Sequence, residues 1–394
     1  MIPMTTPVST FVRSLGRLGC GLLAALPLIA CGPPEPVVLG GIIPESGPGA
    51  QYGPTVRKGM ELAVSEVNEA GGILRGRPIR IEWRDDSTLA GTAQAAARDL
   101  IDSYHVPAIV GGVTSAVGLG LVGLMNQREV PLISPSASSP RLTQAGGKWF
   151  FRVYPSDLAE GSTMANLCGS LGIGRAAMVV YNDPFGTGIA EVFGRYFDAP
   201  SREIVLREAF DGSLTPERAR GIADRVQAAG PDAVYLAAYI DDVVTLLHAL
   251  QQAGFRGVRL GTSAITPDVL RLVGPAAEKL VFPQPPFEGS SDDPQVKAFI
   301  TSYQAKFHQA PNTFAAYGYD AVRVVVEAIE RAMETTPDSI RQQLLEMNYR
   351  GVTGPIDFDE HGDVVKPPRL FVVMKDEIVR FEEFDRSIKG FLLQ

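Results

Sequence analysis

The sequence is poor in cysteine, and this scarcity excludes a fold that is held together by disulfide bonds. Only three cysteines occur among the 394 residues, namely Cys20, Cys31 and Cys168. The first two lie in an N-terminal segment that has the features of an export signal. Cys168 stands inside a helical apolar pattern, where a free thiol usually belongs to the core. We therefore expect no disulfide within the mature chain.

Histidine and clustered positive charge are also scarce. No lysine or arginine run is present and the formal net charge is −8, which argues against nucleic acid as the main partner. Gly186 and Gly188 lack the third glycine of a nucleotide-binding loop, and no Gly-x-Ser-x-Gly motif occurs. Asp85-Asp86, at a strand end, is expected to cap a helix rather than to act in catalysis. Four histidines have no metal-site spacing: His105, His248, His308 and His361. We expect no enzyme activity, no cofactor and no metal.

The N-terminus has the pattern of a lipoprotein signal. Two arginines precede an apolar run from 18 to 28, which is too short for a stable membrane span. Leu28-Ile29-Ala30-Cys31 then looks like a lipobox, although an ordinary signal peptide with a cysteine there by chance is the alternative. We expect residues 1–30 to be a signal peptide and Cys31 to carry the lipid. Residues 31–36 would then tether the domain to the extracytoplasmic face of a bacterial membrane.

The rest of the chain alternates apolar strands with amphipathic helices. Its first unit has a strand at 38–43, a glycine-rich loop that contains Tyr52, a helix that ends near 71–72, and a strand at 79–85. Apolar residues recur at a helical spacing in this unit: Val56, Met60, Ala63 and Val67. Such alternation predicts parallel sheets with helices on both faces. In sheets of this kind, small molecules bind at the carboxyl ends of the strands.

The alternation begins again after residue 152, which predicts two sheets instead of one. We expect an α/β fold of two similar doubly wound lobes with parallel sheets. Extended or proline-marked segments near 153–155, 282–284 and 352–355 are the expected crossings between the lobes. The expected lobes are residues 37–153 with 284–352, and residues 154–283 with 353–394.

Two serine-rich loops follow neighbouring strands of the first lobe. One loop contains Thr114 and Ser115, and the other contains Ser136, Ala137 and Ser138. Hydroxyls and free backbone N–H groups at a helix start can bind a carboxylate without a cationic side chain, because the helix dipole also favours negative charge. A single serine at this place can instead merely cap its helix. Two such loops on adjacent strands favour a ligand site.

These motifs resemble the leucine/isoleucine/valine-binding protein family, whose members are two-lobed solute receptors of ABC importers. The resemblance extends over nearly the whole mature chain and implies a periplasmic-binding-protein type I fold and a membrane permease as partner. It also implies that Ser115, Ala137 and Ser138 hold the α-carboxylate of an amino acid, while Tyr52 walls the pocket. The segments that carry it are Pro44-Glu45-Ser46-Gly47, Gln51-Tyr52-Gly53, Asn68-Glu69-Ala70-Gly71-Gly72-Ile73, Asp85-Asp86 and Ser134 to Thr143.

In the second lobe the resemblance implies Phe185 and Tyr239 as aromatic ligand contacts. Receptors of branched-chain amino acids also carry an acidic residue after the next strand, where it pairs with the ligand ammonium. In this chain Ser263 occupies that position. An uncompensated ammonium in a closed cleft is costly. Either Asp183, Asp241 or another acid replaces the missing one, or the ligand has no amine.

We therefore expect a solute-binding lipoprotein of an ABC importer, which captures a branched-chain or other apolar amino acid by hinge closure of its lobes. Its partners would be the small ligand, the permease and, through Cys31, the lipid bilayer. The alternatives are a receptor for a small aliphatic or aromatic carboxylate or amide, a ligand-sensing subunit of a signalling system, and a scaffold with a degenerate cleft.

Overall fold

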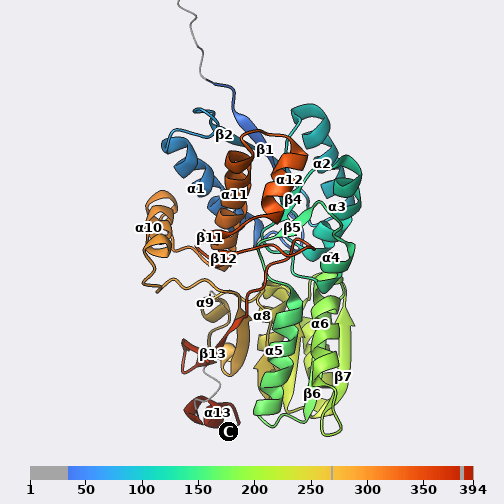
Figure 1. Cartoon of the computed structure of the whole chain (residues 1–394). Helices are drawn as coiled ribbons and strands as arrows, with labels where there is room; N and C mark the ends of the chain where they lie inside the picture. Colours follow the sequence, from blue (N-terminus) through green and yellow to red (C-terminus); the bar gives the residue numbers. More distant parts are fainter. Residues whose placement is uncertain (1–33, 268, 382–385, 394) are drawn as a thin grey trace, which may run out of the picture. The chain divides into compact units, whose positions relative to one another are not determined.

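The structure is a computed structural model of the chain that describes residues 34–267, 269–381 and 386–393 (Figure 1). Residues Glu35–Gln394 form one compact unit. The expected signal peptide and Cys31 lie outside the described residues, so both stay predictions. Among the described helices, none combines the length and the apolar character that a membrane span requires.

The first sheet has five parallel strands in the order β2-β1-β3-β4-β5. The strands are β1 (Val37–Ile43), β2 (Ile79–Asp85), β3 (Ile109–Gly111), β4 (Leu132–Ser134) and β5 (Phe150–Arg152). The connecting helices are α1 (Gly53–Glu69), α2 (Ala90–Tyr104), α3 (Ser115–Arg128) and α4 (Pro140–Ala145). Apolar side chains of α2 and α3 form one core with the sheet, and those of α1 belong to another. Both faces of the sheet are therefore covered.

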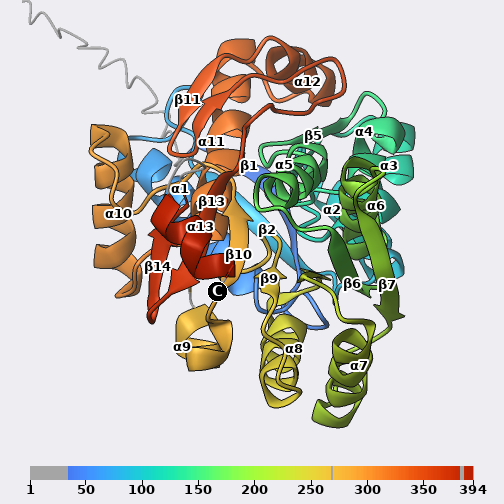
Figure 2. The ribbon, with the colours of Figure 1, turned by 90° about the horizontal axis from the view of Figure 1, so that it is seen from below.

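The second sheet has seven strands in the order β14-β13-β10-β9-β8-β6-β7. Five are parallel: β6 (Arg175–Tyr181), β7 (Glu203–Phe210), β8 (Ala233–Ala237), β9 (Val258–Leu260) and β10 (Leu280–Gln284). Two antiparallel strands complete it, β13 (Arg369–Met374) and β14 (Glu377–Arg380). Its helices are α5 (Asp157–Ser170), α6 (Pro184–Phe197), α7 (Pro216–Ala229), α8 (Ile240–Gln252) and α9 (Val269–Val273), with the 3₁₀ turn η1 (Gly274–Ala277) and the C-terminal α13 (Arg386–Leu393). Figure 2 shows α7, α8 and α9 together on one side of these strands, where their apolar residues share one core.

Between the two sheet-forming segments of the second lobe, the chain returns to the first sheet. It forms α10 (Pro294–Phe307), α11 (Thr313–Ala332), α12 (Pro337–Leu345), β11 (Tyr349–Gly351) and β12 (Gly354–Ile356). Helix α11 packs closely on α1, and two glycines permit this approach. A Cβ atom on Gly59 would lie 1.9 Å from the carbonyl oxygen of Ala315, and one on Gly318 would lie 2.5 Å from that of Val56. Any side chain at either position would therefore force the two helices apart.

The chain crosses between the sheets after β5, after β10 and before β13. The third expected crossing, at 352–355, overlaps β12, which pairs with β11 in a separate two-stranded sheet, and it stays a prediction. Farther along, the Arg152 N–H donates to the Gly362 carbonyl (2.9 Å), and the fully buried Arg152 guanidinium pairs with Asp363 (2.6 Å). We propose that the lobe boundary falls after Asp363. The predicted α/β fold of two lobes with parallel-strand sheets is confirmed.

Candidate functional site

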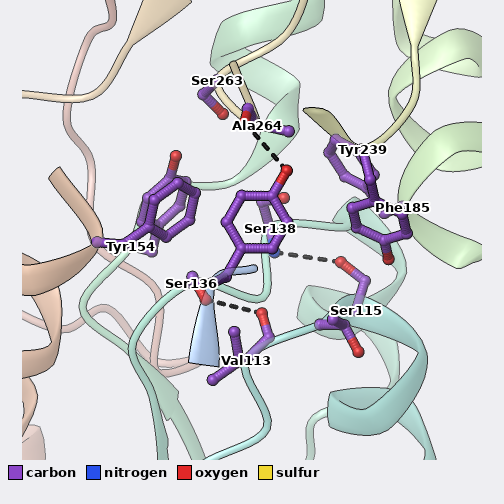
Figure 3. A pocket seen from close by; sticks show the side chains of 12 residues that line it. Val113, Ser115, Ser136, Ser138, Tyr154, Phe185, Tyr239, Ser263 and Ala264 are labelled. Carbon is purple, nitrogen blue, oxygen red and sulfur yellow. Dashed lines mark hydrogen bonds between the residues drawn. The ribbon is translucent and has the colours of Figure 1, made fainter. Parts of the chain in front are cut away.

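A cavity lies where the carboxyl ends of strands from both sheets face one another (Figure 3). Its lining is formed by Tyr52, Val113, Thr114, Ser115, Ser136, Ser138, Tyr154, Phe185, Tyr239, Ser263, Ala264 and Phe314. The free volume at its centre is about 30 Å³, which is room for no more than a few water molecules. Side chains from the two lobes therefore meet closely here, and an amino acid needs a wider opening to enter.

The first-lobe side of the cavity consists of the two serine-rich loops, which are bonded to each other. The Ser136 hydroxyl donates to the Val113 carbonyl (2.7 Å), and the Ser115 hydroxyl accepts from the backbone N–H groups of Ser138 (3.3 Å) and Ser139 (3.1 Å). Helix α3 begins at Ser115 without a side-chain cap. Its first N–H groups and the surrounding hydroxyls together provide the donors that an anion requires.

Glycines at the end of β3 position the first of these loops. Gly112 has a φ of +67°, a conformation that side-chain-bearing residues rarely adopt. A Cβ atom on Gly111 would lie 2.1 Å from the carbonyl oxygen of Ile42 in the neighbouring strand. These two residues turn the chain sharply out of the sheet, and they place Thr114 and Ser115 over its carboxyl edge.

Tyr52 joins the two sides of the cavity. This residue precedes α1 in the first lobe, yet its hydroxyl donates to the Ala264 carbonyl (3.0 Å) and accepts from the Ile240 N–H (3.1 Å) in the second. Its ring also contacts Phe314 and Tyr239, with centroid distances of 4.7 and 6.0 Å. Burial raises the pKa of the Tyr52 phenol, so the hydroxyl remains protonated and can donate.

Asp183 supports the aromatic wall on the second-lobe side. Its carboxylate accepts from the Tyr239 hydroxyl (2.7 Å) and from the Gly186 N–H (2.8 Å), so the same side chain also caps α6. Phe185 stacks on Tyr239 at a centroid distance of 5.5 Å. Burial raises the pKa of Asp183. Asp241, the other acid considered from the sequence, is exposed in the first turn of α8.

Two buried carboxyl groups lie behind Ser263. The Ser263 N–H donates to Glu160 (2.9 Å), and Asp157 stands one helical turn earlier on α5. Both side chains are buried, with exposed fractions of 6% for Glu160 and 1% for Asp157. Burial raises the pKa of Glu160 to about 7, and burial together with the nearby Glu160 raises that of Asp157 well above its usual value. In the sequence these acids look like ordinary first-turn residues of a helix, which the dipole favours.

The structure brings together most of the residues that the sequence singled out. The predicted residues that line the cavity are Tyr52, Thr114, Ser115, Ser136, Ser138, Phe185, Tyr239 and Ser263. Ala137 is fully buried behind this surface, where its N–H donates to the Ser134 hydroxyl (3.0 Å). Four lining residues were not predicted: Val113, Tyr154, Ala264 and Phe314. Of these, Val113 and Ala264 adjoin predicted residues, whereas Tyr154 and Phe314 come from a crossing segment and from α11.

The described residues contain no group of three or more histidine, cysteine, aspartate or glutamate side chains that could hold a metal ion. Cys168 is a free, buried thiol on α5, and burial raises its pKa to about 12. A thiol with so high a pKa is a poor nucleophile at neutral pH. The cavity lining offers hydroxyls, backbone N–H groups and aromatic rings to a ligand, and Glu160 lies behind it at Ser263.

Comparisons with known proteins agree with this geometry. The model of the periplasmic binding protein family matches residues 36–377. The leucine-, isoleucine-, valine-, threonine-, and alanine-binding protein of Pseudomonas aeruginosa is 26% identical over 323 residues, which cover 82% of this chain and 85% of that protein.

Solved structures show the same architecture. The branched-chain amino acid transporter substrate binding protein LivJ from Streptococcus pneumoniae, in complex with isoleucine, has a TM-score of 0.79 and 26% identity, with 88% of this chain and all of that chain covered. An R. palustris solute binding protein in complex with benzoate reaches the same TM-score at 20% identity, with 88% and 95% covered, and this likeness concerns the fold alone. The chain therefore belongs to the periplasmic binding protein family and has the type I fold of its leucine/isoleucine/valine-binding relatives.

Proposed function

We propose that this protein is the extracytoplasmic solute-binding component of an ABC importer and that it captures a branched-chain or other apolar amino acid. The observation that carries this proposal is the cavity itself, which has donors for an anion on one side and aromatic rings beside them. The serine-rich loops suit an α-carboxylate, and Tyr52, Phe185 and Phe314 suit an apolar side chain. The names of its relatives support the same class of ligand.

The proposed mechanism is closure of the two lobes about the crossing segments. A ligand that contacts both sides of the cavity stabilises the closed arrangement over an open one, and a permease then binds the closed form. The small free volume and the Tyr52 hydrogen bonds between the sides support a closed arrangement in this structure. Small-angle scattering should show a smaller radius of gyration when a saturating ligand is added. An unchanged profile with a ligand that calorimetry shows to be bound would contradict closure.

A thermal-shift screen tests the ligand class directly. The protein should be screened against amino acids, small carboxylates and amides, because ligand binding to the folded state raises its melting temperature. We expect leucine, isoleucine or valine to give the largest rise, with charged amino acids such as lysine as the negative control. A screen in which only plain carboxylates or amides raise the melting temperature would overturn the amino-acid assignment.

A second candidate is a receptor for a plain carboxylate. It is favoured by Ser263, since this side chain stands at the cavity where branched-chain amino-acid receptors are expected to have an acid. In such a receptor the anion would still lie against Ser115 and Ser138. The two candidates differ in whether the ligand carries an amine, which the screen distinguishes.

Membrane anchoring through Cys31 is also a proposal. Replacement of this residue, Cys31→Ser, should leave the precursor uncleaved and without lipid, because the thiol is the acceptor for the diacylglyceryl group. Metabolic labelling with a fatty acid measures the modification, and Cys20→Ser is the matched control. A lipid-labelled, membrane-bound Cys31→Ser protein would exclude the lipobox interpretation.

A further inference from the structure

Glu160 on α5 lies behind the cavity wall at Ser263, and Asp157, one turn earlier, lies beside the Ser138 loop, because its N–H donates to the Ser138 carbonyl (2.9 Å). Glu160 accepts a hydrogen bond from the backbone of Ser263, and Ser263 and Ala264 form the cavity wall at this place (Figure 3). The serine-rich loops with Ser115 and Ser136 form the opposite side in the same view. A negative charge on Glu160 therefore lies directly behind the wall that Ser263 forms.

Several polar atoms around these acids have no hydrogen-bond partner among the described residues. They are the Tyr235 and Thr262 hydroxyls and the two carboxyl oxygens of Asp157, whose polar neighbour, the Ser138 hydroxyl, lowers the Asp157 pKa without forming a hydrogen bond of ordinary geometry. All three side chains are at most 1% exposed. Buried polar groups are otherwise nearly always paired, so this group indicates a polar partner that binds here. Carboxyl oxygens are acceptors, and an ammonium group brings three donors.

The protein itself supplies no such partner. Arg152 is the cation whose charge acts on Asp157, but its guanidinium is already fully engaged. It donates to Asp363, to the Thr143 hydroxyl and to two backbone carbonyls. Among the described residues that line the cavity, none is a lysine or an arginine. The positive charge that would pair with the acids is therefore left for the ligand to provide.

We propose that Glu160, backed by Asp157, supplies the negative charge that pairs with an ammonium group of the ligand. The inference rests on the proposed function and narrows it, since the ligand is then a zwitterion and not a plain carboxylate. Its carboxylate lies against the loops of Ser115 and Ser138, and its amine lies at the Ser263 end. A plain carboxylate would bring a second negative charge to the buried acids and no cation, which is unfavourable in a poorly solvated site.

The proposal has a pH signature that follows from the groups around Glu160. The titratable groups that face it are Asp157 on the same helix, Tyr154 from the crossing segment and Tyr235 on β8, while the charges of Arg152 and Asp183 act on Asp157. Because the pKa of Glu160 is about 7, the carboxyl is partly protonated at neutral pH. An ammonium ligand pairs with the ionised form, so leucine affinity should rise from pH 6 to pH 8.

Titration calorimetry with leucine and with 4-methylpentanoate, which lacks the amine, tests the inference in wild-type and Glu160→Gln proteins at pH 8. The glutamine keeps an oxygen that can accept from the Ser263 N–H while it removes the charge. Leucine affinity should fall about 30-fold or more, and affinity for the deaminated acid should stay equal or increase. The control Glu217→Gln, an exposed acid in the first turn of α7, should match wild type.

The outcomes separate the inference from the proposed function. If wild type binds leucine and Glu160→Gln binds it equally well, the inference is overturned and the amino-acid assignment stands. If wild type binds 4-methylpentanoate and no amino acid, or neither ligand, the proposed amino-acid function fails and the inference falls with it. Should Glu160→Gln not fold, the pH series on wild type decides, because leucine affinity that does not rise between pH 6 and pH 8 contradicts the inference.

Discussion

The two sides of the cavity have the same architecture and opposite chemistry. In both lobes, loops at the carboxyl ends of parallel strands lead into helices that cover the sheet. The first lobe presents hydroxyls and backbone N–H groups from Ser115, Ser136 and Ser138, whereas the second lobe holds the carboxyl groups of Asp157 and Glu160. A doubly wound lobe thus fixes where a ligand binds, and the residues on its loops and first helical turns fix which charge it prefers.

The polar groups of the two sides are also satisfied differently. Ser115 and Ser136 are hydrogen-bonded to the backbone of neighbouring loop residues, so the anion side is preorganised without a ligand. Among the described residues the Asp157 carboxyl makes no hydrogen bond of ordinary geometry, although the nearby Ser138 hydroxyl lowers its pKa, and the Glu160 carboxyl is bonded only to Ser263. Burial without pairing costs stability, which is commonly accepted at functional sites. We therefore expect that an added negative charge on the first side weakens ligand binding, and that removal of a negative charge from the second side stabilises the ligand-free protein.

The largest effect is expected from Ser115→Glu, which places a negative charge on the anion side. The new carboxylate would repel the ligand carboxylate and disrupt the bonds from the N–H groups of Ser138 and Ser139, so affinity should fall by at least about 100-fold. Calorimetry measures the loss. Ser201→Glu, at an exposed serine of the second lobe, is the control and should bind normally. If the Ser115→Glu protein still binds the ligand, the ligand carboxylate does not bind at the Ser115 loop.

Removal of a charge from the second side should instead stabilise the ligand-free protein. The folded pKa of Glu160 is about 7, above the ordinary 4.5, so between these values the folded state holds a proton that the unfolded state has lost. Wild-type stability should therefore decline as pH rises from 4.5 to 7, by about 3 kcal/mol from this group. Urea unfolding of Glu160→Gln should show a flatter pH profile and greater stability at pH 7. Equal pH profiles of stability for the two proteins would contradict a buried Glu160 carboxyl with a raised pKa.

Tyr52→Phe tests the connection between the sides and should have an intermediate effect. Without the hydroxyl, the Ile240 N–H and the Ala264 carbonyl lose their partner, at a cost of about 1–3 kcal/mol for each group that stays buried. We expect affinity to fall about tenfold, and the ligand-free protein to have a larger radius of gyration. Tyr196→Phe, at a half-exposed tyrosine of α6, is the control. An unchanged radius and affinity would exclude Tyr52 as a link between the lobes.

The smallest effect is expected from Arg141→Ala. Arg141 on α4 pairs with Glu191 on α6 at 2.8 Å, so this ion pair also joins the two lobes. Both side chains are largely exposed, and exposed ion pairs contribute about 0–1 kcal/mol. Ligand affinity should change by less than about fivefold, and the change should disappear in high salt. A larger, salt-independent loss would show that closure depends on the surface and not on the cavity.

Much of the fold and of the anion side could be predicted because their signals are local. The strand–helix alternation predicted the parallel sheets, and serines that follow glycine- or proline-marked strand ends predicted the loops with Ser115 and Ser138. No local signal points to the lobe boundary that we propose after Asp363, because it depends on contacts of Arg152 with Gly362 and Asp363, more than 200 residues away in the sequence. A buried ion pair between residues so far apart in the sequence produces no recognisable pattern in the residues around 352–355.

The acidic side could not be predicted for the same physical reason. Asp157 and Glu160 begin a helix whose dipole favours acids, so their pattern matches that of any exposed helix start. Their burial depends on β8 and on the loop after β9, which pack over the start of α5. Phe314 also reaches the cavity, from α11, and its sequence neighbourhood indicates only a helix start capped by Asn312. Burial by distant elements decides the role of each of these residues.

A crystal structure of the protein grown with leucine tests the opposite chemistry of the two sides most directly. The account predicts the ligand carboxylate within hydrogen-bond distance of Ser115 and Ser138, the isobutyl group against Tyr52 and Phe314, and the ammonium at the Ser263 end beside Glu160. A leucine bound in the reverse orientation, with its ammonium at the serine-rich loops, or bound outside this cavity would contradict it.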